Sequence, residues 1–209
     1  MARYTQAVCR LCRREGQKLF LKGAKCPTEK CPISRRSYAP GQHGQLRKKE
    51  SNYGVQLREK QKVKRIYGVL EKQFKHYFRM AEHAKGVTGL TLLQLLERRL
   101  DNVVFRMNLA GSRAEARQMV QHGLVYVNNK RVDIPAYTVR LGQEVSVKSK
   151  RETMIKRLKG IQEAFKDRAA PKWIEVKPEE LKCKITAMPT KEDVGFPIQE
   201  QLIVELYSK

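Results

Sequence analysis

The sequence predicts an α+β protein in which a cysteine-rich N-terminal extension precedes helices and a small antiparallel sheet. Three observations support this fold class. The first 31 residues hold two close pairs of cysteines among arginines and lysines. In the middle of the chain, apolar residues recur every three or four positions, which is typical of helices that bury one face. Further on, apolar residues alternate around an Asn-Asn pair, which indicates a β-hairpin.

Positive charge dominates the composition. The 209 residues include 44 Lys and Arg against 21 Asp and Glu, which gives a formal net charge of +23. Such a chain favours a polyanionic partner, either nucleic acid or an anionic membrane surface. The first 30 residues contain no apolar signal segment, and no apolar run approaches the roughly 20 residues of a membrane span. We therefore expect a nucleic acid partner and no membrane.

The charge is graded along the chain. Residues 1–50 carry 13 basic and 3 acidic side chains, whereas residues 151–209 carry 12 and 10. Phosphate contacts are therefore expected mainly toward the N-terminus. The nearly neutral C-terminal segment is better suited to packing on the chain itself or on another protein.

The N-terminal cysteines have the spacing of a metal site. Cys9 and Cys12 form one pair, Cys26 and Cys31 form the other, and a basic spacer separates them. Because thiols stay reduced in the cytosol, a metal is favoured over disulfides. One structural zinc ion suits four thiolates; an iron–sulfur cluster and four unliganded thiols are the alternatives. Cys183 has no neighbouring partner and is interpreted as a small buried hydrophobe.

Residues 32–51 combine Gly, Pro and Ser with cations and have no apolar period, so they should not fold alone. The segment is either a plain linker or a strand of chain that orders against a phosphate backbone. Its cations, together with Tyr38 and His43 as stacking groups, favour the second interpretation.

Two helices are expected on either side of Gly68. The first, around residues 57–66, is strongly cationic, with Glu59 as its single acidic residue, and would suit a phosphate backbone. The second has an apolar stripe that comprises Leu70, Phe74, Tyr77, Phe78 and Ala81.

Two capping boxes mark further helix starts, Thr91 with Gln94 and Ser112 with Glu115. The second of these helices should end at Gly123, because glycine readily adopts the left-handed conformation that closes a helix.

A hairpin should follow, because Asn128 and Asn129 tolerate positive φ between alternating apolar residues, and residues 142–149 form a plausible further strand. The helix edge and the hairpin would bring cations and amides to one surface. An ordinary solvated edge is the alternative, but this edge lacks the interspersed acidic residues of ordinary surfaces. Its members are Arg113, Arg117, Gln121, Asn128, Lys130 and Arg131.

The run from Glu97 to Tyr137, ERRLDNVVFRMNLAGSRAEARQMVQHGLVYVNNKRVDIPAY, is similar to the signature of the family of bacterial small-subunit ribosomal protein four. MARYT at the start, SNYGVQLREKQKVKRIYGVLEKQF in the middle, and PKWIEV and PIQEQLIVELYSK near the end resemble the same family. The resemblance thus covers nearly the whole chain. The four-cysteine N-terminus is similar to the metal-binding version of the family.

The resemblance implies three parts. Residues 1–45 would form a basic metal-knuckle extension, and residues 46–96 with 177–209 would form a mostly helical domain. An RNA-binding domain, with helices packed on the small antiparallel sheet, would be inserted at residues 97–176.

The resemblance also implies a function, that of a cytoplasmic structural constituent of the small ribosomal subunit. Such a protein binds a helical junction in the 5′ domain of small-subunit rRNA and nucleates assembly there. Small-subunit protein five would contact the C-terminal segment and support translational accuracy, and messenger RNA passing nearby would be a further partner.

The candidate RNA-binding residues are cations, amides or stacking groups. They are Arg3, Arg10, Arg13, Arg14, Lys22, Arg35, Arg36, Tyr38, His43, Arg47, Lys48, Lys49, Arg58, Lys60, Lys62, Lys64, Arg65, Arg113, Arg117, Gln121, Asn128, Lys130 and Arg131.

An RNA-modifying enzyme or another nucleic-acid-binding regulator with the same RNA-binding domain is the alternative. An enzyme would need a catalytic module, but the sequence has no GxxxxGK loop, no GxGxxG and no HExxH, and its four histidines are scattered. We therefore expect no catalytic residues and no enzyme activity.

Overall fold

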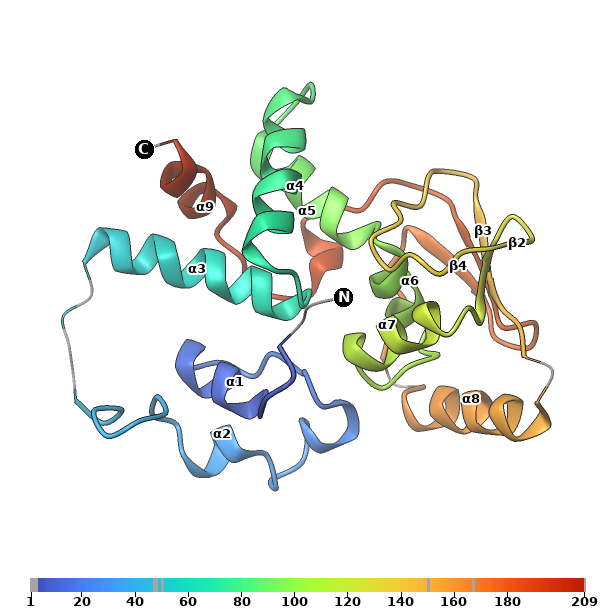
Figure 1. The fold of residues 1–209 in the computed structure, drawn as a ribbon, viewed down its shortest axis with the longest axis horizontal. Helices are drawn as coiled ribbons and strands as arrows, with labels where there is room; N and C mark the ends of the chain where they lie inside the picture. Colours follow the sequence, from blue (N-terminus) through green and yellow to red (C-terminus); the bar gives the residue numbers. More distant parts are fainter. Residues whose placement is uncertain (1–3, 47–48, 50, 150, 167, 209) are drawn as a thin grey trace. The chain divides into compact units, whose positions relative to one another are not determined.

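A computed structural model describes residues 4–46, 49, 51–149, 151–166 and 168–208 (Figure 1). The chain divides into two compact units, one made of residues 1–91 with 196–209 and the other of residues 92–195. The first unit is helical and the second contains a sheet, so the fold class is α+β as expected. None of the described helices is both long and apolar enough to span a lipid bilayer.

The first unit is built from both ends of the chain. Its elements are α1 (Cys9–Glu15), η1 (Gly23–Lys25), α2 (Pro32–Arg35), α3 (Asn52–Ile66), α4 (Glu71–His83) and α9 (Glu200–Tyr207). Gly68, at φ 62°, separates α3 from α4 as the sequence predicted. Ser51 caps α3, since its Oγ accepts a hydrogen bond from Gly54 N at 3.1 Å.

Aromatic side chains form the core of this unit. Phe74, Tyr77 and Phe78 of α4 are buried, whereas Leu70, which was expected in the same stripe, is 45% exposed because it precedes the helix as its N-cap. Tyr207 of α9 stacks on Phe78 with ring centroids 4.4 Å apart. Figure 1 shows α9 beside α3, and the two helices are in contact.

The second unit contains a five-stranded antiparallel sheet of order β2-β1-β3-β5-β4 in the described part of the chain. Its strands are β1 (Val125–Val127), β2 (Lys130–Arg131), β3 (Glu144–Val147), β4 (Ile174–Lys177) and β5 (Lys182–Ile185). Its helices are α6 (Leu100–Arg106), α7 (Arg113–Gln121), α8 (Glu152–Ala164) and η2 (Glu192–Val194), and α5 (Thr88–Glu97) leads into it from the first unit.

The boundary between the units differs from the expected one. Residues 177–195 were assigned to the helical domain, but they belong with the sheet. The reason is that β5 pairs with β3, with Val145 opposite Cys183, and so lies inside the sheet. The inserted unit therefore extends to residue 195 and begins at residue 92.

The predicted hairpin is confirmed. Val127 pairs with Lys130, and Asn128 and Asn129 adopt φ of 46° and 63°, as a two-residue primed turn requires. The Asn128 side chain also accepts a hydrogen bond from Glu144 N at 2.9 Å, which fixes the turn against β3.

One hydrophobic core joins the sheet to its helices. It includes Val125 and Val145 from the strands, Val104 from α6, Val120 from α7 and Leu158 from α8. Cys183 lies in the same core, and burial raises its pKa to about 12. This confirms its interpretation as a buried hydrophobe.

The two predicted capping boxes have different outcomes. Ser112 caps α7, since its Oγ accepts from Glu115 N at 3.3 Å, while the Glu115 side chain accepts from Gly111 N at 2.9 Å. The prediction for Thr91 is wrong, because α5 already begins at Thr88 and the Thr91 hydroxyl donates to Val87 O inside the helix.

Candidate nucleic-acid interface

The four N-terminal cysteines lie around one small cavity of about 10 Å³. Cys12, Cys26 and Cys31 are buried and Cys9 is half-buried, and all four are free thiols. Cys9 and Cys12 come from α1, whereas Cys31 directly precedes α2. The Cys26 sulfur accepts a hydrogen bond from Lys22 N at 3.3 Å.

The donor set suits a soft metal, although the side chains do not have the arrangement of a bound site. Burial raises the pKa of Cys12 and of Cys26, and neighbouring cysteines of the set raise both further. Within the described ranges, no group of three or more His, Cys, Asp or Glu side chains is arranged to hold a metal ion. The structure therefore gathers the four thiols and leaves the metal itself a prediction.

Most described cations predicted in the N-terminal extension reach solvent. Arg13 is the exception, since its guanidinium lies 4.9 Å from the centroid of the Tyr38 ring and its Nε donates to Tyr38 O at 3.0 Å. Arg13 and Tyr38 thus hold this part of the extension together. The exposed candidates are Arg10, Arg14, Lys22, Arg35, Arg36, His43 and Lys49. Arg3, Arg47 and Lys48 lie outside the described residues.

The five cations of α3 are all engaged inside the first unit. Arg58 and Arg65 contact the carboxylate of Glu15 on α1, the first at 3.2 Å. Lys60 and Lys64 each lie 2.7 Å from a Glu71 oxygen on α4. Lys62 is 7% exposed. Its ammonium pairs with Glu59 at 2.7 Å and donates to Pro197 O at 2.8 Å.

This arrangement changes the interpretation of α3. The sequence showed Glu59 as the single acid offsetting its cations, and this suggested a helix free to lie on phosphate. Glu15 and Glu71 come from other helices, and Glu15 is almost completely buried beneath the two guanidiniums. The α3 cations therefore join α1, α3 and α4, and their predicted RNA contacts would compete with these pairs.

The α3 pairs also shift the acidity of Glu71. Burial acts to raise its pKa, but the hydrogen bonds from Lys60 and Lys64 outweigh burial and hold the pKa at about 2. Tyr207 donates to the same carboxylate at 3.1 Å, and burial followed by the Glu71 charge raises the tyrosine pKa above its usual range.

The predicted basic edge of α7 is partly buried. Arg113 is 8% exposed, its guanidinium lies 4.4 Å from the centroid of the Phe105 ring, and its Nε donates to Asn102 at 2.8 Å. Arg117 lies 3.6 Å from Asp101, which a second arginine, Arg99, also engages. The acidic residue that the α7 edge lacks in sequence is therefore supplied by α6.

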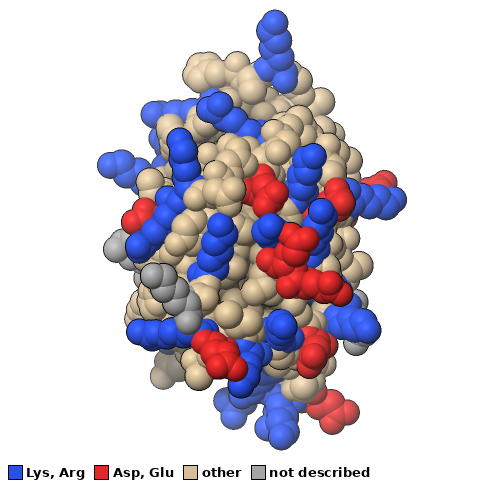
Figure 2. Space-filling model, turned by 90° about the vertical axis from the view of Figure 1, so that its right-hand side faces the viewer, with Lys and Arg blue, Asp and Glu red and all other residues tan. Residues whose placement is uncertain are grey.

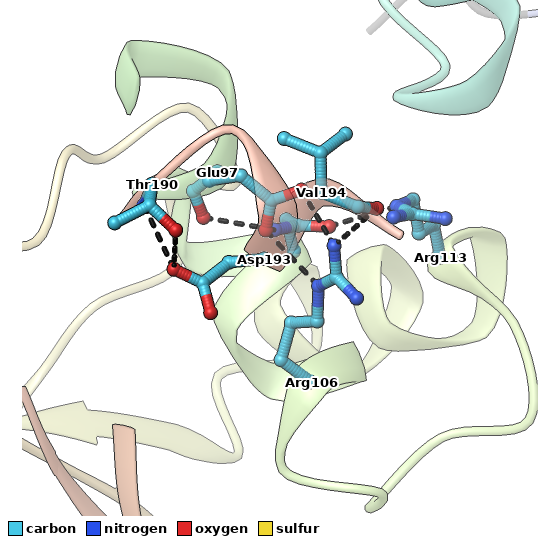
Figure 3. A network of polar contacts seen from close by, with 7 residues as sticks. Glu97, Arg106, Arg113, Thr190, Asp193 and Val194 are labelled. Carbon is cyan, nitrogen blue, oxygen red and sulfur yellow. Dashed lines mark hydrogen bonds and ion pairs between the residues drawn. The ribbon is translucent and has the colours of Figure 1, made fainter. Parts of the chain in front are cut away.

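Figure 3 shows the network behind this edge. The Glu97 carboxylate accepts from Arg106 Nη2 at 2.7 Å and Nε at 3.0 Å, and from Asn102 at 2.8 Å. Arg106 also donates to Val194 O at 2.8 Å, which attaches η2 to α6. Asp193 accepts from the hydroxyl of Thr190 at 2.7 Å. Arg113 donates to the same Asn102 side chain, so it belongs to this buried network of the second unit.

The hairpin presents the exposed part of the predicted surface. Lys130 and Arg131 of β2 are exposed, as are Gln121 and Asn128. The Arg131 guanidinium lies against Gly123, at the C-terminal end of α7. Of the six residues predicted on this surface, these four reach solvent and the two α7 arginines face inward.

Sequence reasoning missed the outer face of α4. Lys72, Lys75 and Arg79 are exposed there, opposite the buried aromatic stripe. Their spacing of three, four and seven residues is the same helical signal that identified the stripe, so the sequence could have revealed them. In the view of Figure 2, acidic side chains lie among the Lys and Arg.

The chain matches two family models. The Ribosomal protein S4/S9 N-terminal domain covers residues 3–97, and the S4 domain covers residues 98–145. Together these two matches span most of the chain.

Several curated relatives match along their whole length. The small ribosomal subunit protein uS4 of Acetivibrio thermocellus is 59% identical over 209 residues, with 100% of both chains covered. The protein of the same name from Halothermothrix orenii is 59% identical over 210 residues, and uS4A of Alkaliphilus metalliredigens is 59% identical over 209, both with 100% coverage of each chain. The chain therefore belongs to the uS4 family of small ribosomal subunit proteins.

Proposed function

We propose that the protein is a structural constituent of the small ribosomal subunit that binds rRNA and nucleates assembly of the 5′ domain. The full-length identity to proteins named small ribosomal subunit protein uS4 carries this proposal. The same identity argues against the RNA-modifying enzyme, since that alternative requires a catalytic module beyond the shared domain. A place in the cytoplasmic ribosome follows from the same assignment.

The binding mechanism is recognition of RNA shape and phosphate by exposed cations on a rigid scaffold. Helical RNA hides most base edges, so a junction is recognised through its backbone, 2′-hydroxyls and unstacked bases. Exposed arginines would contact phosphate, and they are Arg10, Arg14, Arg35 and Arg36 of the extension and Arg131 of the hairpin. Arginine suits this role because its planar fork can donate two parallel hydrogen bonds to one phosphate.

Binding to a 5′-domain rRNA fragment across a salt series tests the function. We expect affinity to fall steeply with salt, by about 0.7–0.9 in the logarithmic slope for each phosphate contact. Arg35→Gln with Arg36→Gln should reduce both affinity and slope, whereas Glu179→Gln with Glu180→Gln, in the β4–β5 turn, should leave the slope unchanged. Equal binding to the junction fragment and to an unrelated RNA of the same length would contradict specific recognition.

The four N-terminal cysteines hold one structural zinc ion in this proposal. The common cavity supports it, because all four cysteines line the same small space and four thiolates satisfy one tetrahedral zinc ion. Bound zinc would join α1 to the segment before α2. It would thereby give a fixed shape to the basic N-terminal extension, which is too short to fold around a hydrophobic core of its own.

Metal analysis and a visible spectrum on protein purified without oxygen test the site. We expect about one zinc per chain and no colour for a four-thiolate site. Cys12→Ala should abolish binding, and Cys183→Ala, which lies in the sheet core, should retain it. Iron with a brown colour would establish the cluster instead, and an absence of metal in freshly purified protein would contradict both forms of the proposal.

The C-terminal helix is proposed to receive protein five of the small subunit, and messenger RNA would pass nearby. Ile203 of α9 is buried, while Leu202, Val204 and Leu206 remain half-buried, which gives a partly apolar surface suited to a protein. Leu206→Lys should weaken recruitment of protein five to assembled subunits while rRNA-fragment affinity is unchanged. If the variant recruits protein five as well as the wild-type protein does, α9 is not the binding site for protein five.

A further inference from the structure

The outer face of α4 forms a regular row of cationic and imidazole side chains. At 100° per residue, positions 72, 76, 79 and 83 fall on one line, directly opposite the stripe buried by Phe74 and Tyr77. All four members of the row are exposed, and Lys75 is exposed beside them. The members, called the α4 row below, are Lys72, His76, Arg79 and His83.

The cations of this face are not used by the fold. No ion pair or hydrogen bond joins the side chains of Lys72, Lys75 or Arg79 to another part of the chain that the structure describes. This contrasts with α3, where carboxylates of α1 and α4 engage the cations. Glu71 of α4 faces α3, so Glu82 is the acidic residue beside the exposed row.

We infer that the α4 row is a second surface for the RNA backbone, separate from the N-terminal extension and from the hairpin. The inference rests on the proposed function and assigns part of it to residues that sequence motifs did not identify. Side chains one helical turn apart are about 5–6 Å from each other, a spacing close to that of successive phosphates along a strand. Lysine and arginine supply charge, and the imidazoles supply additional N–H donors.

Charge complementarity selects RNA over a protein partner. Three strong cations, Lys72, Lys75 and Arg79, lie on this face of α4. Its acids are Glu82 and Glu71, and Glu71 is already paired with Lys60 and Lys64 of α3. Cations therefore prevail on this face, whereas an ordinary solvated face balances both signs. Lysine is depleted at protein–protein interfaces, and the row carries no aromatic anchor. A polyanionic backbone therefore fits this face better than a folded protein does.

Salt-dependent binding of the full chain to the 5′-domain rRNA fragment tests the inference. Lys72→Gln with Arg79→Gln should reduce the slope of log K against log salt by about 1.5, since two phosphate contacts are lost. Lys156→Gln with Lys159→Gln on α8 is the matched control. These two substitutions also remove two positive charges, but from a helix where Lys156 already pairs with Glu152 at 2.9 Å. The salt slope of the α8 variant should therefore equal that of the wild-type protein.

A gain of binding guards against misfolding as an explanation. Glu82→Lys adds a cation beside the α4 row and should steepen the slope by about 1. A slope for the Lys72 and Arg79 double variant equal to that of the α8 control, with a folded far-UV spectrum, would overturn the inference. That result would leave the proposed function intact as long as the wild-type protein binds the fragment, whereas failure of the wild-type protein to bind would contradict the function itself.

Discussion

Arg113 was predicted from the sequence to bind RNA, but in the structure its side chain stabilises the second unit. Its Nε donates to Asn102, and its guanidinium lies on the Phe105 ring. Arg113→Ala should lower the free energy of unfolding by about 2–3 kcal/mol, because it leaves the buried Asn102 oxygen without this donor. Urea denaturation measures the change.

Lys130→Ala is the control, since an exposed hairpin cation should alter stability by no more than about 0.5 kcal/mol. Equal stability of the two variants would show that Arg113 is not part of the scaffold. The basic edge of α7 would then be available to RNA, as the sequence first suggested.

Glu71 gives a pH-dependent prediction at the same scale. Its folded pKa of about 2 lies below the ordinary 4.5, so its pairs with Lys60 and Lys64 stabilise the fold fully above about pH 4.5. This contribution is lost as the pH falls from 4.5 toward 2, when the carboxylate is protonated. The urea midpoint of Glu71→Gln should therefore be lower than that of wild type at pH 7 and should converge with it near pH 2.

Single residues were predicted well where the signal was local. The pairs of cysteines were expected to converge, and they line one cavity. The ion pairs of the α3 cations could not be predicted, because their carboxylate partners lie on other helices and a charge count along one segment cannot include a residue such as Glu15. The partners of the α7 arginines could not be predicted for the same reason, since Asn102 and Asp101 come from α6.

At the scale of elements, α8 contains a glycine with no structural requirement. A Cβ added at Gly160 would meet nothing within 4 Å, and the residue lies inside the helix. Gly160→Ala should therefore raise the free energy of unfolding by about 0.5–1 kcal/mol, through the better helix propensity of alanine. Thermal or urea unfolding would reveal it.

Gly123→Ala is the matched comparison, with the opposite sign. Gly123 has a φ of 68° and lies against the Arg131 guanidinium, so alanine there is both strained and crowded. We expect a loss of about 1 kcal/mol or more. A stabilising effect at both positions would mean that the left-handed turn after α7 is not needed.

Elements were predictable where the chain pairs with its near neighbours. The Asn128–Asn129 turn and the Ser112 cap depend on residues two or three positions apart, and both formed as expected. The strand β5 was missed because its partner is β3, more than 30 residues away, and this long-range pairing moved the domain boundary. The predicted start of α5 at Thr91 was too late, because the helix already begins at Thr88.

For the whole molecule, the main feature is a first unit that needs both ends of the chain. Gln56 of α3 donates to Glu205 at 2.8 Å, and Tyr207 packs on Phe78. Removal of residues 200–209 should therefore unfold the first unit and leave residues 92–195 folded. Limited proteolysis with mass spectrometry would then yield a protected fragment close to residues 92–195.

Tyr207→Ala should produce a milder form of the same result, with earlier cleavage in α3 and α4 and no change in the sheet unit. Simultaneous loss of protection in both units would show that they unfold as one. Unchanged protection of α3 after the truncation would show that the last helix is dispensable.

The split first unit has a consequence for the chain while it is being made. The sheet unit is complete once residue 195 has left the exit tunnel, but α3 and α4 must wait for α9, which is synthesised after it. A nascent or prematurely terminated chain therefore lacks the folded platform on which its basic surfaces stand. We expect that only chains that include α9 acquire full RNA affinity, so that synthesis of this helix acts as a check before the protein enters a new subunit.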